Sequence, residues 1–217
     1  AFSEVGSRSH FWAPVSGATK QGDDVRLDAK KSWVTAANHA DAYVWSSSPL
    51  AAEGASTLWL VPRKSQGISA PPAFDGLGLR GNDSTPVTAD GVVVPASHQL
   101  GPDGKGFDLM MGVVLPIFSV LSAACSIGLM EGAIGRSAAH LSGTRYQHLD
   151  SALRDLPTIR AYIARMRCRA DAAKALWLDS LSALESGRED ATLRVLQVKA
   201  VAAESALEVM ATGMRIC

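Results

Sequence analysis

The sequence predicts an α+β protein in which an antiparallel β-barrel or sandwich is followed by an antiparallel helical bundle of the four-helix type. Up to about residue 102, short runs of β-branched residues alternate with Gly, Pro, Ser and Asp, which is typical of a small antiparallel β domain. From residue 106 onward, long stretches carry apolar residues at helical spacing. We therefore expect a β domain at 1–103 and an incomplete helical domain at 104–217.

The composition describes a globular chain with balanced charge. Of 217 residues, 47% are hydrophobic, and 21 basic residues match 21 acidic ones. This balance gives no reason to expect nucleic acid or an acidic membrane as a partner. Cys125, Cys168 and Cys217 fit neither a disulfide framework nor a metal site, so we expect a reducing compartment, the cytoplasm.

The two ends of the chain predict a fragment of a longer protein. The sequence opens on Ala1 without an initiator Met or a signal-peptide pattern. It stops at Cys217 inside a helical pattern with no cap or breaker. We therefore expect the helical bundle to lack its fourth helix.

Short strands separated by turn signals fill the first domain. We expect them at 18–20, 25–29, 42–46, 57–61, 87 and 92–95. The loop at 7–9 follows Gly6, and its hydroxyl and N–H groups suit phosphate oxygens, although such a loop is more often only a loop. The segment 103–106 is interpreted as a connector into the next helix, because it lacks the spacing of a phosphate-binding P-loop.

Three helices are predicted in the second domain. Residues 107–142 are almost free of charge, which indicates a helix buried in its domain or against a partner subunit. A membrane span is the alternative, and Pro116 and the interrupting serines argue against it. The next helices are expected at 151–185 and from Glu189 to the end. The apolar residues of the last helix that we expect to face inward are Leu193, Leu196, Val201, Leu207 and Met210.

Two features could carry chemistry. In the segment 31–35, Lys-Ser-Trp-Val-Thr, the strand period sends Trp33 and Thr35 to the same side, so an indole and a hydroxyl could hold a planar heterocycle. The alternative is a core Trp next to a strand Thr. Glu131 lies in an apolar helix, either as a base with a raised pKa or, more simply, as a partnered structural carboxylate.

Known chemical motifs are missing from the sequence. It has no nucleotide fingerprint, no Ser nucleophile elbow and no metal-binding His motif. The residues by themselves therefore predict a planar-ligand site and no particular reaction.

An ordered set of segments resembles the acyl-CoA dehydrogenases. Residues 3–10, Ser-Glu-Val-Gly-Ser-Arg-Ser-His, are similar to that family's Thr-Glu-Pro-Gly-x-Gly-Ser-Asp, and residues 31–35 to its Lys-x-Trp-Ile-Thr. The segments 79–85, 92–95 and 100–107 match further middle-domain motifs in the same order. The resemblance covers essentially the whole chain and implies a middle β domain and most of a C-terminal helical domain.

The resemblance implies an FAD site. Phe2 and Ser3 would lie beside the flavin ring, and Ser9 would reach the pyrophosphate. Trp33 would pack along the isoalloxazine, and Thr35 would hydrogen-bond near N5. A further residue, Arg145, would reach the FAD of a neighbouring subunit in a dimer or homotetramer assembled through the helical domain.

The activity implied is α,β-dehydrogenation of an acyl thioester, with hydride passing to flavin N5 and on to electron-transfer flavoprotein or oxygen. The catalytic residue stays unknown, because the usual Glu position of the family lies beyond Cys217. Arg8 and His10 replace a Gly and an Asp of the family, and the segment 116–119 lacks the charges that meet CoA. The alternatives are a flavin oxidase or monooxygenase with a non-CoA substrate, or a non-catalytic oligomerising fragment.

Overall fold

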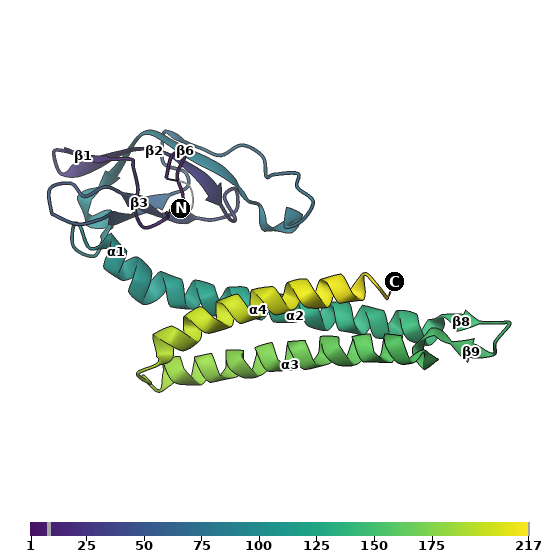
Figure 1. Cartoon of the computed structure of the whole chain (residues 1–217). Helices are drawn as coiled ribbons and strands as arrows, with labels where there is room; N and C mark the ends of the chain where they lie inside the picture. Colours follow the sequence, from purple (N-terminus) through teal and green to yellow (C-terminus); the bar gives the residue numbers. More distant parts are fainter. Residues whose placement is uncertain (8–9, 217) are drawn as a thin grey trace. The chain divides into compact units, whose positions relative to one another are not determined.

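The structure, a computed structural model, describes residues 1–7 and 10–216 (Figure 1). The chain divides into two compact units, Ala1–Gly112 and Val113–Cys217. The first unit contains two antiparallel β-sheets, and the second contains three long helices. An α+β class with antiparallel sheets followed by helices is therefore confirmed.

The described part of the first unit is built from seven strands, of which β2 and β6 have 11 residues each. A four-stranded sheet has the order β1-β2-β6-β5, and a three-stranded sheet has the order β3-β4-β7. The bounds of the strands are β1 Ala18–Gln21, β2 Asp24–Val34, β3 Ala42–Ser47, β4 Thr57–Pro62, β5 Ile68–Ser69, β6 Thr85–Pro95 and β7 Gln99–Leu100. Two 3-10 turns, η1 (Arg80–Asn82) and η2 (Ala96–His98), flank β6.

Alternation along the strands builds the core of the first unit. On β2, Val25 and Leu27 are buried while Arg26 is exposed, as the strand period requires. Trp45 of β3 lies opposite Trp59 of β4, and both are almost fully buried. The indole N–H of Trp59 donates a hydrogen bond to Ser47 Oγ at 2.9 Å. These two tryptophans are therefore structural.

A β-bulge interrupts β2 where the sequence predicts a binding residue. Lys31 pairs with Val87 of β6, but Val34 pairs with Thr85, so β2 has one extra residue between the two pairs. Such a bulge re-aims the side chains that follow it. Lys31 and Val34 are both buried, and Trp33 between them is 66% exposed.

The segment 103–106 is a connector, as the sequence predicts. The Asp103 carboxylate accepts N–H hydrogen bonds from Leu50, Ala51 and Ala52, each at 2.9 Å. Burial raises the pKa of Asp103, but these hydrogen bonds and one from the Thr57 hydroxyl outweigh burial and hold the pKa well below its usual range. The connector leads into the short helix α1 (Gly106–Leu109) and a π-helical turn at Met110–Val114.

Three long helices form the second unit: α2 (Leu115–Gly143), α3 (Pro157–Glu185) and α4 (Ala191–Gly213). The last helix packs along both α2 and α3 (Figure 1). Between α2 and α3, a small hairpin of β8 (Arg145–Tyr146) and β9 (Ser151–Ala152) precedes the 3-10 turn η4 (Leu153–Asp155). The expected second helix therefore begins later than residue 151.

The prediction of which residues of the last helix face inward is wrong. Leu207 is 73% exposed and Leu193 is 55% exposed. The residues of α4 that pack inward are mostly small, namely Val195, Val198, Ala202, Ser205, Val209, Thr212 and Gly213. Small side chains let helix backbones approach closely, so they occupy the contact with α2 and α3. Both faces of α4 are apolar, and periodicity alone did not distinguish them.

The first long helical stretch also leaves apolar surface exposed. Leu121 is 61% exposed and Leu129 is 59% exposed. By length and composition, the helical stretch Gly106–Gly143 could cross a membrane, a test that the core helices of globular proteins also pass. In its most apolar part, 28% of the residues are buried within the chain.

Candidate cofactor site

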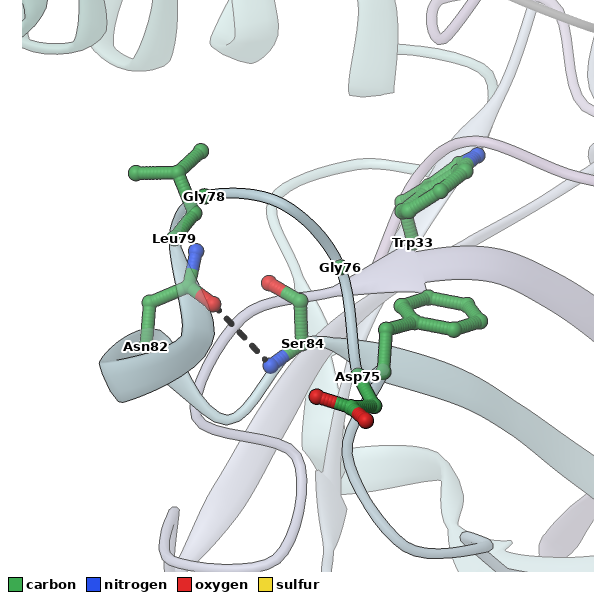
Figure 2. Close-up of a pocket in the computed structure, with 8 residues that line it drawn as sticks. Trp33, Asp75, Gly76, Gly78, Leu79, Asn82 and Ser84 are labelled. Carbon is green, nitrogen blue, oxygen red and sulfur yellow. Dashed lines mark hydrogen bonds between the residues drawn. The ribbon is translucent and has the colours of Figure 1, made fainter.

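The bulged end of β2 presents an indole to a pocket on the surface of the first unit. Trp33 borders a pocket of about 470 Å³ with a mainly apolar surface (Figure 2). Its lining consists of Trp33, Phe74, Asp75, Gly76, Gly78, Leu79, Asn82 and Ser84. With 66% of its surface accessible, Trp33 is not the core residue of the alternative interpretation.

Two hydroxyl groups lie beside each other at this site. Thr35 is exposed, and its Oγ1 is 3.4 Å from Ser84 Oγ. The N–H of Ser84 donates to Asn82 Oδ1 at 3.2 Å, which is the dashed line in Figure 2. A hydroxyl carries one donor and two acceptor positions, so Thr35 and Ser84 both retain capacity for a ligand.

The turn after Thr35 fixes the loop that carries Ser84. The Asp83 carboxylate accepts from the backbone N–H of Asn38 at 2.6 Å and from its side-chain amide at 3.0 Å. The Asn38 hydrogen bonds hold the pKa of Asp83 below its usual value. Ala36 N–H donates to Asn82 O at 3.0 Å. These contacts explain why residues far apart in sequence keep a fixed spacing at the pocket.

The N-terminal segment is paired to the same strand. Glu4 and Lys31 form an antiparallel bridge, and Ser32 N–H donates to Ser3 O at 2.8 Å. The structure therefore places Ser3 beside Ser32, the neighbour of Trp33 on β2. The ring of Phe2 pairs with that of Phe11, with centroids 6.4 Å apart.

A buried ion pair under this stretch was missed by the sequence reasoning. Lys31 Nζ donates to Glu4 Oε1 at 2.5 Å, to Ser46 O at 2.7 Å and to Ser46 Oγ at 2.9 Å. Glu4 Oε2 accepts the N–H groups of Val15 and Ser16 at 2.8 and 2.9 Å. The available signal was Lys31 itself, because a charged residue on the inward side of a strand requires a buried partner.

The electrostatics of the pair follow from its burial. Burial lowers the pKa of Lys31 to about 8, against the opposing effect of the Glu4 carboxylate. Burial raises the pKa of Glu4, but the hydrogen bonds from Lys31 and Ser16 outweigh it and leave that pKa below its usual value. The pair is therefore ionised at neutral pH.

One of the predicted site residues lies in the other unit. Ser9 lies outside the described residues. Arg145 lies on β8 in the second unit, where its side chain is 59% exposed and forms an ion pair with Asp150 at 3.0 Å. Its guanidinium lies on an exposed hairpin of its own unit.

Glu131 is a structural carboxylate. It accepts two hydrogen bonds from the Arg167 guanidinium, at 2.6 and 2.7 Å, and Arg167 also contacts Asp171 at 2.7 Å. The hydrogen bonds from Arg167 lower the pKa of Glu131. The interpretation of Glu131 as a base with a raised pKa is therefore wrong, and its interpretation as a partnered carboxylate is confirmed.

Over the part of the chain that the structure describes, there is no cluster of three or more His, Cys, Asp or Glu that could hold a metal.

The chemistry of the pocket suits a flat heteroaromatic ring. The accessible indole of Trp33 offers a stacking surface, and Ser84 offers a hydrogen bond to a polar ring edge. Thr35 is not among the lining residues, but its hydroxyl lies 3.4 Å from that of Ser84. The mainly apolar lining disfavours a highly charged ligand group at this point. An isoalloxazine, which has a broad flat face and polar edge atoms, fits this donor set.

Comparison with known proteins decides the family. Residues 1–92 match the family described as acyl-CoA dehydrogenase, middle domain, and residues 104–217 match acyl-CoA dehydrogenase, C-terminal domain. The chain belongs to the acyl-CoA dehydrogenase family. The order of the two matches is the order of the two units in the structure.

Relatives in this family share modest identity over nearly the whole chain. Cyclohex-1-ene-1-carbonyl-CoA dehydrogenase of Syntrophus aciditrophicus (strain SB) is 26% identical over 100% of this chain and 52% of its own length. Glutaryl-CoA dehydrogenase of Desulfococcus multivorans is 26% identical over 98% of this chain and 54% of its own length. The chain thus spans about half the length of the curated relatives it matches.

Solved acyl-CoA dehydrogenase structures share the fold. Butyryl-CoA dehydrogenase from Megasphaera elsdenii superimposes with a TM-score of 0.90 at 22% identity, over 99% of this chain and 56% of that one. An FAD-dependent dehydrogenase gives a TM-score of 0.89 at 23% identity, over 100% of this chain and 57% of that one. At this identity, the likeness shows the fold.

Proposed function

We propose that this chain is the flavin-binding part of an FAD-dependent enzyme that dehydrogenates an acyl thioester between its α and β carbons. The observation that carries the proposal is the accessible indole of Trp33 next to the hydroxyls of Thr35 and Ser84. Membership of the acyl-CoA dehydrogenase family supports acyl-CoA as the substrate class. When bound, FAD supplies the acceptor for the hydride, at ring N5.

Each residue of the site has a definite task in this proposal. Trp33 stacks along the ring and excludes water from one side of it. Thr35 donates a hydrogen bond to the polar edge of the ring near N5, and Phe2 and Ser3 line the same edge. From the family motif alone, Ser9 is proposed to bind the pyrophosphate. No catalytic base is assigned among residues 1–217.

Self-association would cover the apolar faces of the helices. The outward faces of α2 and α4 carry large exposed apolar residues, among them Leu121, Leu129 and Leu207. Exposed apolar surface of this kind marks an interaction site. We infer a homo-oligomer, a dimer or tetramer, assembled through the helical unit, in which Arg145 reaches the FAD of a neighbour. The finer architecture, a β-barrel or sandwich followed by an incomplete helical bundle of the four-helix type, belongs to the same proposal. A cytoplasmic location is proposed as well.

The electron acceptor is proposed from a relative. A caffeyl-CoA reductase-Etf complex subunit, CarC of Acetobacterium woodii (strain ATCC 29683 / DSM 1030 / JCM 2381 / KCTC 1655 / WB1), is 26% identical over 100% of this chain and 56% of its own length. Electron-transfer flavoprotein is therefore the first acceptor to test, with oxygen as the second.

A second candidate function is a flavin-dependent oxidase or monooxygenase acting on a non-CoA substrate. One observation favours it. Near the start of α2, Ile117 and Phe118 are 56% and 57% exposed. Family members that use CoA thioesters commonly carry charged residues in this stretch. An apolar surface there suits a substrate without phosphates.

Three measurements on the purified full-length protein test these candidates. Uptake of FAD with a flavin absorbance spectrum supports both, whereas a colourless protein that takes up no added FAD overturns both. Anaerobic bleaching of the flavin by a panel of acyl-CoAs supports the dehydrogenase. No bleaching, together with oxygen consumption that depends on an NADH-fed flavin reductase, supports the second candidate.

A further inference from the structure

An indole as exposed as that of Trp33 needs support before it can be a rigid stacking surface. A free Trp side chain has two rotatable bonds, and a ligand that must fix them loses affinity. Among the aromatic pairs formed by the described residues, Trp33 is paired with Phe74, with ring centroids 4.5 Å apart and an interplanar angle of 45°. This separation lies in the favourable range for aromatic pairs.

The backbone around Phe74 is fastened to the same elements that build the pocket. Phe74 N–H donates to Ser84 O at 2.9 Å. Just before it, Pro72 O accepts from Thr85 Oγ1 at 3.0 Å, and Pro71 O accepts from the Asn38 amide at 3.3 Å. The backbone that carries the Phe74 ring is therefore held by β6, by the residue before it and by the turn after the strand that carries Trp33.

Other apolar residues of this loop do not share the role. Leu77 is fully exposed and is not among the residues that line the pocket. Leu79 is 83% exposed and lies across the pocket from Trp33 in Figure 2. Phe74 is less exposed, at 40%, and its ring lies against that of Trp33. The loop thus provides one aromatic that contacts Trp33 and one apolar residue, Leu77, that serves as a matched control.

We propose that Phe74 is a positioning residue that holds the indole of Trp33 ready for the flavin and thereby raises the affinity for FAD. The inference rests on the proposed flavin site. Most of the Trp33 surface remains accessible despite the contact with Phe74, so the brace and the ligand do not compete for it. An aromatic pair of this kind corresponds to about a 2- to 12-fold change in an equilibrium constant.

A double-mutant cycle on the full-length protein tests the proposal. Phe74→Ala should raise the FAD dissociation constant about 2- to 12-fold, and Phe74→Tyr, which keeps a ring, should restore it. Leu77→Ala should leave the constant unchanged. In a Trp33→Ala background, Phe74→Ala should have no further effect on the constant, because the ring it supports is gone. Circular dichroism of each variant checks that the fold is retained.

A second readout does not need the cofactor. The fluorescence of Trp33 is obtained as the difference between the protein and its Trp33→Phe variant. Acrylamide should quench this fluorescence more strongly in Phe74→Ala, because the indole is less covered, and equally in Leu77→Ala. Equal FAD affinity in the protein and Phe74→Ala, or an equal loss in the Trp33→Ala background, overturns this inference alone. Wild-type protein that takes up no FAD overturns the proposed function and this inference together.

Discussion

Lys31 and Glu4 form a buried ion pair that joins the N-terminal segment to β2, with Lys31 Nζ 2.5 Å from Glu4 Oε1 and side-chain exposures of 0% and 2%. The ammonium group also lies 5.1 Å from the centroid of the Trp45 ring. The bulge that turns Trp33 outward follows directly after Lys31. The pair therefore fixes the base of the candidate flavin site, two residues from the indole.

The first prediction concerns this pair. Lys31→Met should lower the free energy of unfolding by about 3–5 kcal/mol, because it leaves the Glu4 carboxylate buried and unpaired. The double variant Glu4→Gln/Lys31→Met should recover part of that loss, since no buried charge remains. Urea denaturation at pH 7 measures the two single variants, Lys31→Met and Glu4→Gln, and the double variant. A double variant as unstable as the sum of the single variants would show that the two residues do not act as a pair.

The second prediction concerns acid stability at Asp103. Its pKa is lower in the folded state than in the unfolded state, so its contribution is present above the unfolded pKa and is lost as the pH falls through the folded value. Asp103→Asn should cost about 1–3 kcal/mol at pH 7, because several charge-assisted hydrogen bonds are weakened. Denaturation curves between pH 7 and pH 3 should show that the difference in unfolding free energy between the wild type and Asp103→Asn becomes smaller at the acidic end. A difference that is constant over this range contradicts the assignment.

The third prediction concerns Thr35. Thr35→Ala should weaken FAD binding about fivefold or slow the reduction of the flavin, because one hydrogen bond of about 1 kcal/mol at the ring edge is lost. Thr19→Ala, at an exposed position of β1, is the matched control. Flavin content and rapid-mixing reduction kinetics provide the measurements. Wild-type behaviour of Thr35→Ala in both would exclude this hydroxyl from the site.

The fourth prediction separates the two apolar faces of α4. Leu207→Glu, on the exposed face, should shift the protein toward monomers without unfolding it. Gln197→Glu adds the same charge at an exposed polar position and should not change the oligomeric state. Sedimentation equilibrium distinguishes the species.

The inward face of α4 should respond differently. Ala202→Leu should lower the unfolding free energy by about 1–3 kcal/mol, since the close contact with the other helices cannot hold the extra atoms. For the exposed face, a Leu207→Glu protein that keeps the oligomeric mass of the wild type would contradict assembly through that face of α4.

Several features could be read from the sequence. Strands and helices follow from local periodicity, so their order and most of their positions were predictable. The ordered motifs around the segments 3–10 and 31–35 indicated the family without any structure. Trp33 and Thr35 were placed on one side because alternate residues of a strand share a side, and the family motif made them the expected flavin contacts.

The tertiary structure decided the rest. One extra residue in β2 turned Trp33 outward, and no local pattern marks a bulge that depends on pairing with β6. The contacts of Phe74 with Trp33 and of Glu4 with Lys31 join segments that are distant in sequence. On α4, both faces are apolar, and only the fit of small side chains against α2 and α3 selected the inward one. The sequence thus determined which residues belong to strands, helices and motifs, whereas long-range packing determined which side chains face the pocket.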